Sequence, residues 1–345
     1  MSLCEGAARV IPVEERVGAV FAAAGAEARL HAVAIGPGPS VPNGPPGRAG
    51  SPDGAGSEDG RASEDGAGSE DRAGSAGRAE IAIGADEPVV LASVFKVLLV
   101  LEFARQVAAG QLDPRERVWV TADDRLGGWG TAGCLDDIEV SLRDLAHFAM
   151  SVSDNSAADL LLARVGTDTV RLLAAELGLH RTRILGGPRQ SLETMLAEVG
   201  ARDEREFAAI YPSLTAERLR GLSVLDPERT SASTPREITR LLELIWRDEA
   251  GPPEACARVR ELMGRQVFRH RLVSGFPDEV RVAAKTGTLP GLHAEAGVVH
   301  YPDGGRYAVA VFARTGDPVT NRTAVDSAIG AAARIAVEAL REGRG

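Results

Sequence analysis

Residues 37–78 cannot contribute to a folded core, and this restricts the fold of the chain more than any other feature. The segment is almost entirely Gly, Pro, Ala, Ser, Asp, Glu and Arg, and it repeats "SED" three times. A stretch with so few apolar side chains cannot bury enough surface to offset the entropy of folding, so we expect it to be disordered. The core must therefore form from the residues on either side of it.

The flanking residues have the alternating pattern of strands. A helix over 12–25 precedes a strand at 28–36, and "AEIAIGADEPVVLAS" (79–93) reads as a second strand with a turn. Three more strands are expected in "EVRVAAKTG", "HAEAGVVHYP" and "GRYAVAVFART", with a hairpin turn at "DGG" (303–305) and a final helix after them. Residues from about 94 to 270 have mainly helical spacing of apolar side chains.

This order of elements predicts an α+β fold. Hairpin-linked strands at both ends of the chain imply an antiparallel sheet flanked by the terminal helices, with an all-α domain inserted between them. We place the sheet domain at 1–104 plus 276–345, with 37–78 as a loop within it. The all-α domain then covers 105–275.

Composition excludes several classes of function. The net charge of −10 argues against a nucleic-acid partner, which would need a basic surface. No apolar run is long enough to cross a membrane, and the N-terminus has no signal pattern, so we expect a cytoplasmic protein unless the start codon is misassigned. The cysteines and histidines have no metal-ligand spacing, so we expect no metal or other cofactor. No feature indicates an obligate protein partner.

Lysine is rare in this chain, and its two positions are informative. Of 39 basic residues only Lys96 and Lys285 are lysine; the others are arginine. Lys96 lies in an apolar helix three residues after Ser93, so both side chains project from one face. Burial lowers the pKa of a lysine, whose neutral amine can then take a proton from a serine hydroxyl, whereas arginine stays protonated. The alternative is that Ser93 caps the helix and Lys96 extends to water.

Two further motifs follow in order along the chain. "SDN", with Ser153 and Asn155, lies at an expected helix boundary, where capping is the ordinary explanation. "KTGT", from Lys285 to Thr288, ends an expected strand and can hold a carboxylate; the alternative is a lysine that protects a sheet edge. Together the three motifs use both lysines and indicate a catalytic site.

The motifs S93-V-F-K96, S153-D-N155 and K285-T-G287 resemble those of penicillin-recognising serine hydrolases, above all class A β-lactamases. The resemblance implies that Ser93 is the nucleophile, Lys96 its base and Ser153 the proton donor to the leaving nitrogen. It also implies an oxyanion hole formed by the backbone N–H groups of Ser93 and Thr288. The residues that it implies for substrate binding are Asn155, Lys285, Thr286, Gly287, Thr288, Arg271 and Trp129.

The sequence departs from class A enzymes where they carry the glutamate that activates the deacylating water. Counting back from "DPERTSASTP" puts that position at Glu217, whereas counting forward from "LHRTRIL" puts it at Pro188. We take Glu217 as the fourth catalytic candidate, with Glu193 as another. Both can equally be ordinary acidic residues on helix surfaces.

The resemblance implies a small-molecule substrate, a β-lactam or a related amide or ester, and favours hydrolysis of β-lactam rings through an acyl-enzyme on Ser93. One alternative is an amidase, esterase or peptidase of the same fold. Another is a penicillin-binding module that turns over slowly, because the deacylating glutamate has no clear counterpart.

Overall fold

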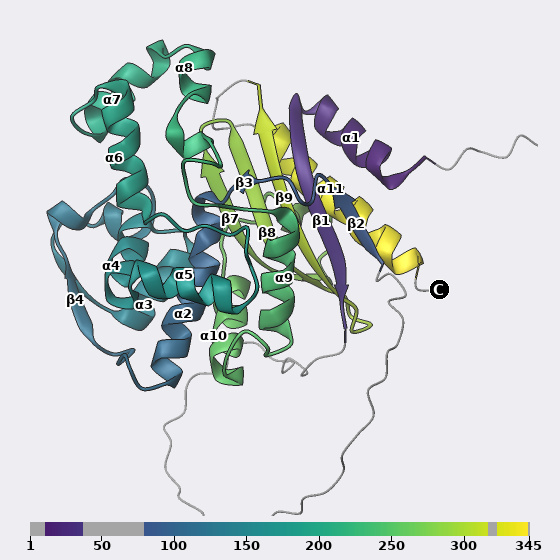
Figure 1. Cartoon of the computed structure of the whole chain (residues 1–345), viewed down its shortest axis with the longest axis horizontal. Coiled ribbons are helices and arrows are strands. Elements are labelled where there is room, and N and C mark those ends of the chain that lie inside the picture. The colour runs from purple at the N-terminus through teal and green to yellow at the C-terminus, as the bar shows by residue number, and fades with distance from the viewer. Residues whose placement is uncertain (1–10, 37–78, 317–322, 344–345) are drawn as a thin grey trace, which may run out of the picture. The chain divides into compact units, whose positions relative to one another are not determined.

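The computed structural model describes residues 11–36, 79–316 and 323–343, and Figure 1 shows their arrangement. The expected disorder of 37–78 falls outside these residues and stays a prediction. The division into a sheet domain and an all-α domain at residues 104, 105, 275 and 276 also stays a prediction.

A five-stranded antiparallel sheet forms from both ends of the chain, in the order β2-β1-β9-β8-β7. This confirms the predicted α+β fold with an antiparallel sheet. Gly304, in the expected "DGG" turn between β8 and β9, has a positive φ of 86°. The strands are β1 (Ala26–Ile35), β2 (Glu80–Ile83), β7 (Arg281–Leu289), β8 (Leu292–His300) and β9 (Arg306–Thr315).

The expected second strand and turn in 79–93 are confirmed, but four short strands were not expected. After β2 and the turn that follows it, a further strand, β3 (Val89–Val90), leaves the sheet to pair with β6 (Ala232–Ser233). The predominantly helical region also contains a second ribbon, β4 (Arg117–Val120) paired with β5 (Ile138–Ser141). These strands are only two to four residues long, which is too short for periodicity to detect.

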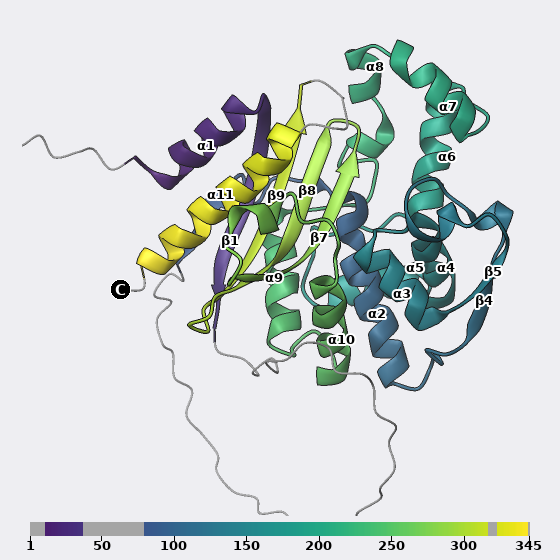
Figure 2. The same ribbon diagram turned by 180° about the vertical axis from the view of Figure 1, so that it is seen from behind.

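Helices cover both faces of the main sheet. The terminal helices α1 (Val13–Ala23) and α11 (Thr323–Glu342) pack on one face, and α9 (Pro235–Trp246) packs on the other, as Figures 1 and 2 show from opposite sides. Successive residues of β1 therefore enter two separate cores: Ala34 packs with α1 and α11, whereas Val33 packs with α9 and the helical region. A strand with both faces buried has a continuous apolar run, as β9 has from Tyr307 to Ala313.

The remaining helices lie beside the β7 edge of the sheet. The α2 helix packs against α4 and α10, and it follows a short 3-10 helix, η1 (Ala92–Phe95), that contacts β7. The bounds of these helices are α2 (Lys96–Ala108), α3 (Leu142–Ser151), α4 (Asn155–Val165), α5 (Thr167–Glu176), α6 (Pro188–Val199), α7 (Glu204–Ile210), α8 (Ala216–Arg220) and α10 (Pro253–Gly264).

The contact between α11 and the 3-10 helix η6 (Leu272–Gly275) provides a test of the packing. A methyl group on Gly330 would lie 2.5 Å from the Arg271 carbonyl oxygen and 2.8 Å from the Gly275 nitrogen, and backbone atoms cannot easily move away. We expect Gly330→Ala to lower the free energy of unfolding by about 1–3 kcal/mol, measured by denaturant titration. Gly18→Ala in α1 is the matched control, because it meets open space and should raise stability by up to about 1 kcal/mol. Equal stability of the two variants would contradict this packing.

Candidate active site

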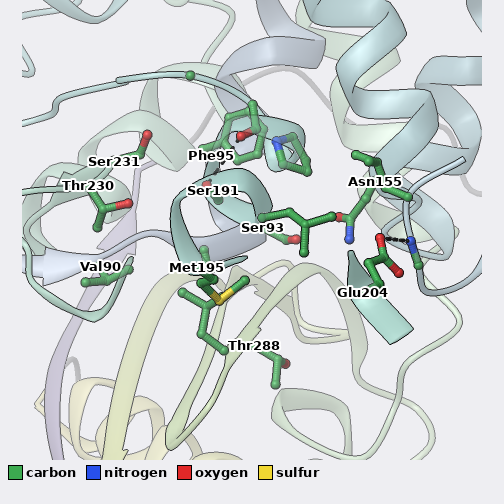
Figure 3. A pocket seen from close by; sticks show the side chains of 18 of the residues that line it. Val90, Ser93, Phe95, Asn155, Ser191, Met195, Glu204, Thr230, Ser231 and Thr288 are labelled. Carbon is green, nitrogen blue, oxygen red and sulfur yellow. Dashed lines mark hydrogen bonds between the residues drawn. The ribbon is translucent and has the colours of Figure 1, made fainter. Parts of the chain in front are cut away.

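Ser93 lies at a strained turn beside a cavity. The expected long helix begins instead as η1, and Ala92, directly before Ser93, has a positive φ of 43°. A residue with a Cβ atom adopts this conformation only where its surroundings enforce it, and such residues are common at functional sites. Ser93 lines a cavity of about 320 Å³, hereafter the pocket, within the size range of small-molecule sites (Figure 3). Its walls come from η1, α4, α6, α7, the end of β7 and residues 126–127, 186–187 and 230–231.

Lys96 is completely buried beneath the SDN motif. Its Nζ donates hydrogen bonds to the carbonyl oxygens of Ser153 (2.7 Å) and Asp154 (3.2 Å) and to Asn155 Oδ1 (2.9 Å). Burial lowers the pKa of Lys96 to about 7, although the nearby carboxylates of Asp154 and Asp159 oppose the shift. The alternative that Lys96 extends to water is therefore wrong.

No hydrogen bond links Ser93 to Lys96 among the described residues. Catalytic hydrogen bonds are often long or poorly aligned before a substrate is bound. The missing hydrogen bond therefore does not exclude proton transfer from Ser93 to Lys96. Ser153 Oγ lies 3.4 Å from Lys96 Nζ and is the hydroxyl within reach of that amine.

The second lysine reaches the same hydroxyl from the sheet. Lys285, on β7, is fully buried, and its Nζ donates to Ser153 Oγ (2.9 Å) and to the Thr286 carbonyl oxygen (3.0 Å). Burial and the positive charge of Lys96 lower the pKa of Lys285 well below its usual value. An edge-protecting lysine would face solvent, so that alternative is wrong. The Ser153 hydroxyl thus lies between two amines, and this arrangement can pass a proton.

Asp154 fixes the SDN motif in place. It caps α4 by accepting from Ala157 N (3.0 Å), and its other oxygen accepts from Thr131 N (2.6 Å). Capping therefore does occur at this boundary, as the ordinary explanation required, but through Asp154. Ser153 meanwhile has a positive φ of 59°, and Asn155 lines the pocket.

The end of β7 approaches η1 closely, and this brings Thr288 to the pocket. A methyl group on Gly287 would lie 3.0 Å from the Leu91 carbonyl oxygen and 3.2 Å from Ala92 Cβ, so only glycine fits without a shift. Thr288 lines the pocket on this side.

Arg271 lies behind this strand. Its guanidinium is buried and donates to Gly287 O (2.9 Å), Thr288 Oγ1 (2.9 Å) and Asp326 Oδ1 (2.7 Å). Arg271 therefore holds the Thr288 hydroxyl, and its predicted contact with a substrate carboxylate stays a prediction.

Of the residues predicted for the site, only Ser93, Asn155 and Thr288 line the pocket. Three of the others lie on the protein surface. Trp129 is 69% exposed and lies two residues beyond the lining residue Gly127. Glu217, on α8, and Glu193, on α6, are both exposed. The roles predicted for these residues stay predictions, and none has a contact with the pocket that would support it.

Pro188, the position reached by the forward count, does line the pocket. It is the first residue of α6, and it cannot activate a water molecule because its side chain carries no base.

Sequence reasoning missed two carboxylates near the site. Asp159, one helical turn after Asn155, accepts from Arg189 N (3.0 Å) and holds the start of α6; burial raises its pKa to about 6. A methyl group on Gly187 would lie 2.1 Å from Asp159 Oδ1, so the Asp159 side chain would have to move to admit it. Glu204, on α7, lines the pocket and accepts from Gly127 N (2.9 Å). Asp159 could have been predicted, because it lies four residues after Asn155 and so on the same face of the helix. Glu204 could not, because its hydrogen-bond partner Gly127 is distant in sequence.

The double role of Asp154 predicts a large loss of stability when its carboxylate is removed. We expect Asp154→Ala to lower the free energy of unfolding by about 2–4 kcal/mol, because it removes a helix cap and leaves a buried N–H without an acceptor. The matched control is Asp203→Ala, which removes only the exposed cap of α7 and should cost about 1 kcal/mol. Thermal or denaturant unfolding measures both, and similar losses would contradict a bracing role for Asp154.

The described residues contain neither a membrane span nor a metal cluster. None of their helices is long and apolar enough to cross a membrane. Within the same part of the chain, no group of three or more His, Cys, Asp or Glu side chains is placed to hold a metal ion. The expected absence of a cofactor stays a prediction.

Comparisons with known proteins agree with this geometry. Residues 74–340 match the model of the beta-lactamase enzyme family. The beta-lactamase regulatory protein BlaB of Streptomyces cacaoi is 29% identical over 279 residues, which cover 76% of this chain and 89% of BlaB.

Solved structures share the fold at lower identity. A β-lactamase from Sphaerobacter thermophilus DSM 20745 has a TM-score of 0.66 at 22% identity, covering 94% of this chain and 97% of that one. A point mutant of PBP-A, solved as an acyl-enzyme complex with penicillin G, has a TM-score of 0.65 at 17% identity and covers 96% of both chains. The ancestral GNCA class A β-lactamase has a TM-score of 0.67 at 19% identity, covering 95% of this chain and 100% of that one. With the family model matched over most of its length, the chain belongs to the beta-lactamase enzyme family.

Proposed function

We propose that this protein is a serine hydrolase that β-lactams acylate on Ser93. The observation that carries the proposal is the Ser153 hydroxyl, which lies 2.9 Å from Lys285 Nζ and 3.4 Å from Lys96 Nζ. Two buried amines with lowered pKa values around one hydroxyl, next to a serine at a strained turn, have the composition of a proton-transfer site.

The acylation step follows from these positions. Ser93 Oγ attacks the lactam carbonyl carbon and gives its proton to the neutral amine of Lys96. As the C–N bond of the ring breaks, a proton passes through the Ser153 hydroxyl to the leaving nitrogen. The backbone N–H groups of Ser93 and Thr288 are the donors proposed for the developing oxyanion.

The negative charge of the substrate has a matching partner in the site. Lys285 is the nearby cation for a substrate carboxylate, and Thr288 presents its side chain to the pocket next to it. Asn155 Oδ1 is occupied by Lys96, which leaves the amide N–H groups of Asn155 for an acyl side chain.

The fate of the acyl-enzyme separates hydrolysis from slow-turnover binding. Of the residues that line the pocket, only Glu204 carries a carboxylate, and Pro188 occupies the position given by the forward count. The scarcity of carboxylates around the pocket favours slow deacylation. A penicillin-binding module with slow turnover is therefore the second candidate. The name of BlaB, a regulatory protein, is consistent with that candidate.

Incubation with a penicillin and a chromogenic cephalosporin, followed by intact mass spectrometry over time, tests the proposal. We expect one equivalent of adduct that forms quickly and is absent from Ser93→Ala, because that variant has no nucleophile. Many turnovers would identify an efficient β-lactamase, and a persistent adduct would identify the slow-turnover module. If neither an adduct nor turnover is observed, the proposal is wrong and an amidase, esterase or peptidase acting on another substrate is left.

The role of Lys96 predicts a strong difference between the two lysines. We expect Lys96→Arg to lower the acylation rate constant by about 10² or more, because arginine cannot accept the serine proton. Lys285→Arg keeps a positive charge near the substrate carboxylate, so its acylation rate constant should fall less. Stopped-flow kinetics measures the acylation rate constants of both variants. A near-normal rate constant for Lys96→Arg would rule out Lys96 as the base.

A further inference from the structure

Glu204 joins two distant segments at one side of the pocket. It is the first residue of α7, whose N-cap Asp203 accepts from Glu206 N (2.7 Å). The Glu204 carboxylate accepts from the backbone N–H of Gly127 (2.9 Å), and in Figure 3 it lies on the same side of the view as Asn155. The position of this carboxylate is therefore set both by its helix and by the loop that it contacts.

Glu204 is the one charged residue among those that line the pocket. It forms no ion pair within the described part of the chain, so its charge has no partner there. Apolar residues of the lining lie close in the chain to its contact with Gly127: Leu126 directly precedes Gly127, and Phe207 is one turn further along α7. A ligand group that fits such a wall is itself apolar and carries a positive charge.

The other end of the site has the opposite charge. Lys285 is buried beside Ser153, and the buried Arg271 guanidinium supports Thr288 from behind. A substrate that spans both ends would carry a carboxylate toward Thr288 and a cation toward Glu204. Complementary charges of this kind contribute mainly to selectivity between ligands.

We propose that Glu204 determines specificity, favouring β-lactams whose acyl side chain bears an ammonium group next to an apolar ring. The inference rests on the proposed acylation of Ser93, and it adds the class of substrate. Glu204 is exposed, so the attraction is partly screened by water, and we expect a preference of about three- to tenfold.

A pair of penicillins isolates this charge. Benzylpenicillin and ampicillin differ only by an α-amino group on the acyl side chain, and their second-order acylation constants can be compared at a pH where that amine is protonated. We expect Glu204→Gln to lower the ampicillin-to-benzylpenicillin ratio by about three- to tenfold. The amide oxygen of glutamine can still accept from Gly127 N, so this variant removes the charge and keeps the contact.

Glu254→Gln is the matched control, because Glu254 is an exposed acid in the first turn of α10 and lies outside the pocket, so the ratio should not change in it. Added salt should lower the ratio in the wild type and have no effect on it in Glu204→Gln.

Other outcomes overturn the inference in distinguishable ways. An unchanged ratio in Glu204→Gln would contradict it while leaving acylation of Ser93 intact. An unchanged acylation ratio with equally slowed deacylation of both penicillins would assign Glu204 to water activation instead. Absence of any adduct with either compound would overturn the proposed function and, with it, this inference.

Discussion

The site depends on a lysine ammonium that the fold keeps away from water. Lys96 is fully buried, and moving such a cation out of water costs several kcal/mol unless other groups compensate. Three oxygen atoms of the SDN motif, from Ser153, Asp154 and Asn155, accept its hydrogen bonds and offset part of this cost. Because the folded pKa of about 7 lies below the usual value of 10.5, the unfolded chain binds more protons between these values. The lysine therefore lowers stability most at low pH, and this penalty decreases as pH rises from about 7 to about 10.5.

The same constraint explains why several unrelated segments meet at one point. Ser93 comes from a turn, Ser153 from a helix junction and Lys285 from the edge strand of the sheet. Asp154 braces the junction, and Gly287 allows the strand to approach the turn. The helices α6 and α7 complete the wall of the pocket on the side of Asn155 (Figure 3). Pro188 and Glu204 are among the residues that they contribute.

The sequence predicted the sheet, the terminal helices and the three motifs, because each leaves a local signal. Strand alternation identified β1, and the scarcity of lysine identified Lys96 and Lys285. It did not predict β3 to β6, because strands of two to four residues have no measurable period. It also missed Glu204, whose hydrogen-bond partner Gly127 is far away in sequence, since a pairing of this kind is set by tertiary packing.

The central claim is that burial keeps Lys96 able to lose its proton near neutral pH. Since the chain has only two lysines, uniform labelling of lysine with ¹³C and ¹⁵N gives just two sets of side-chain NMR signals, which Lys285→Arg assigns. The account predicts that the Cε signal of Lys96 titrates with a midpoint of about 7, and that the Lys285 signal also titrates well below the usual range. A Lys96 signal that titrates at the ordinary lysine pKa of about 10.4 would contradict it.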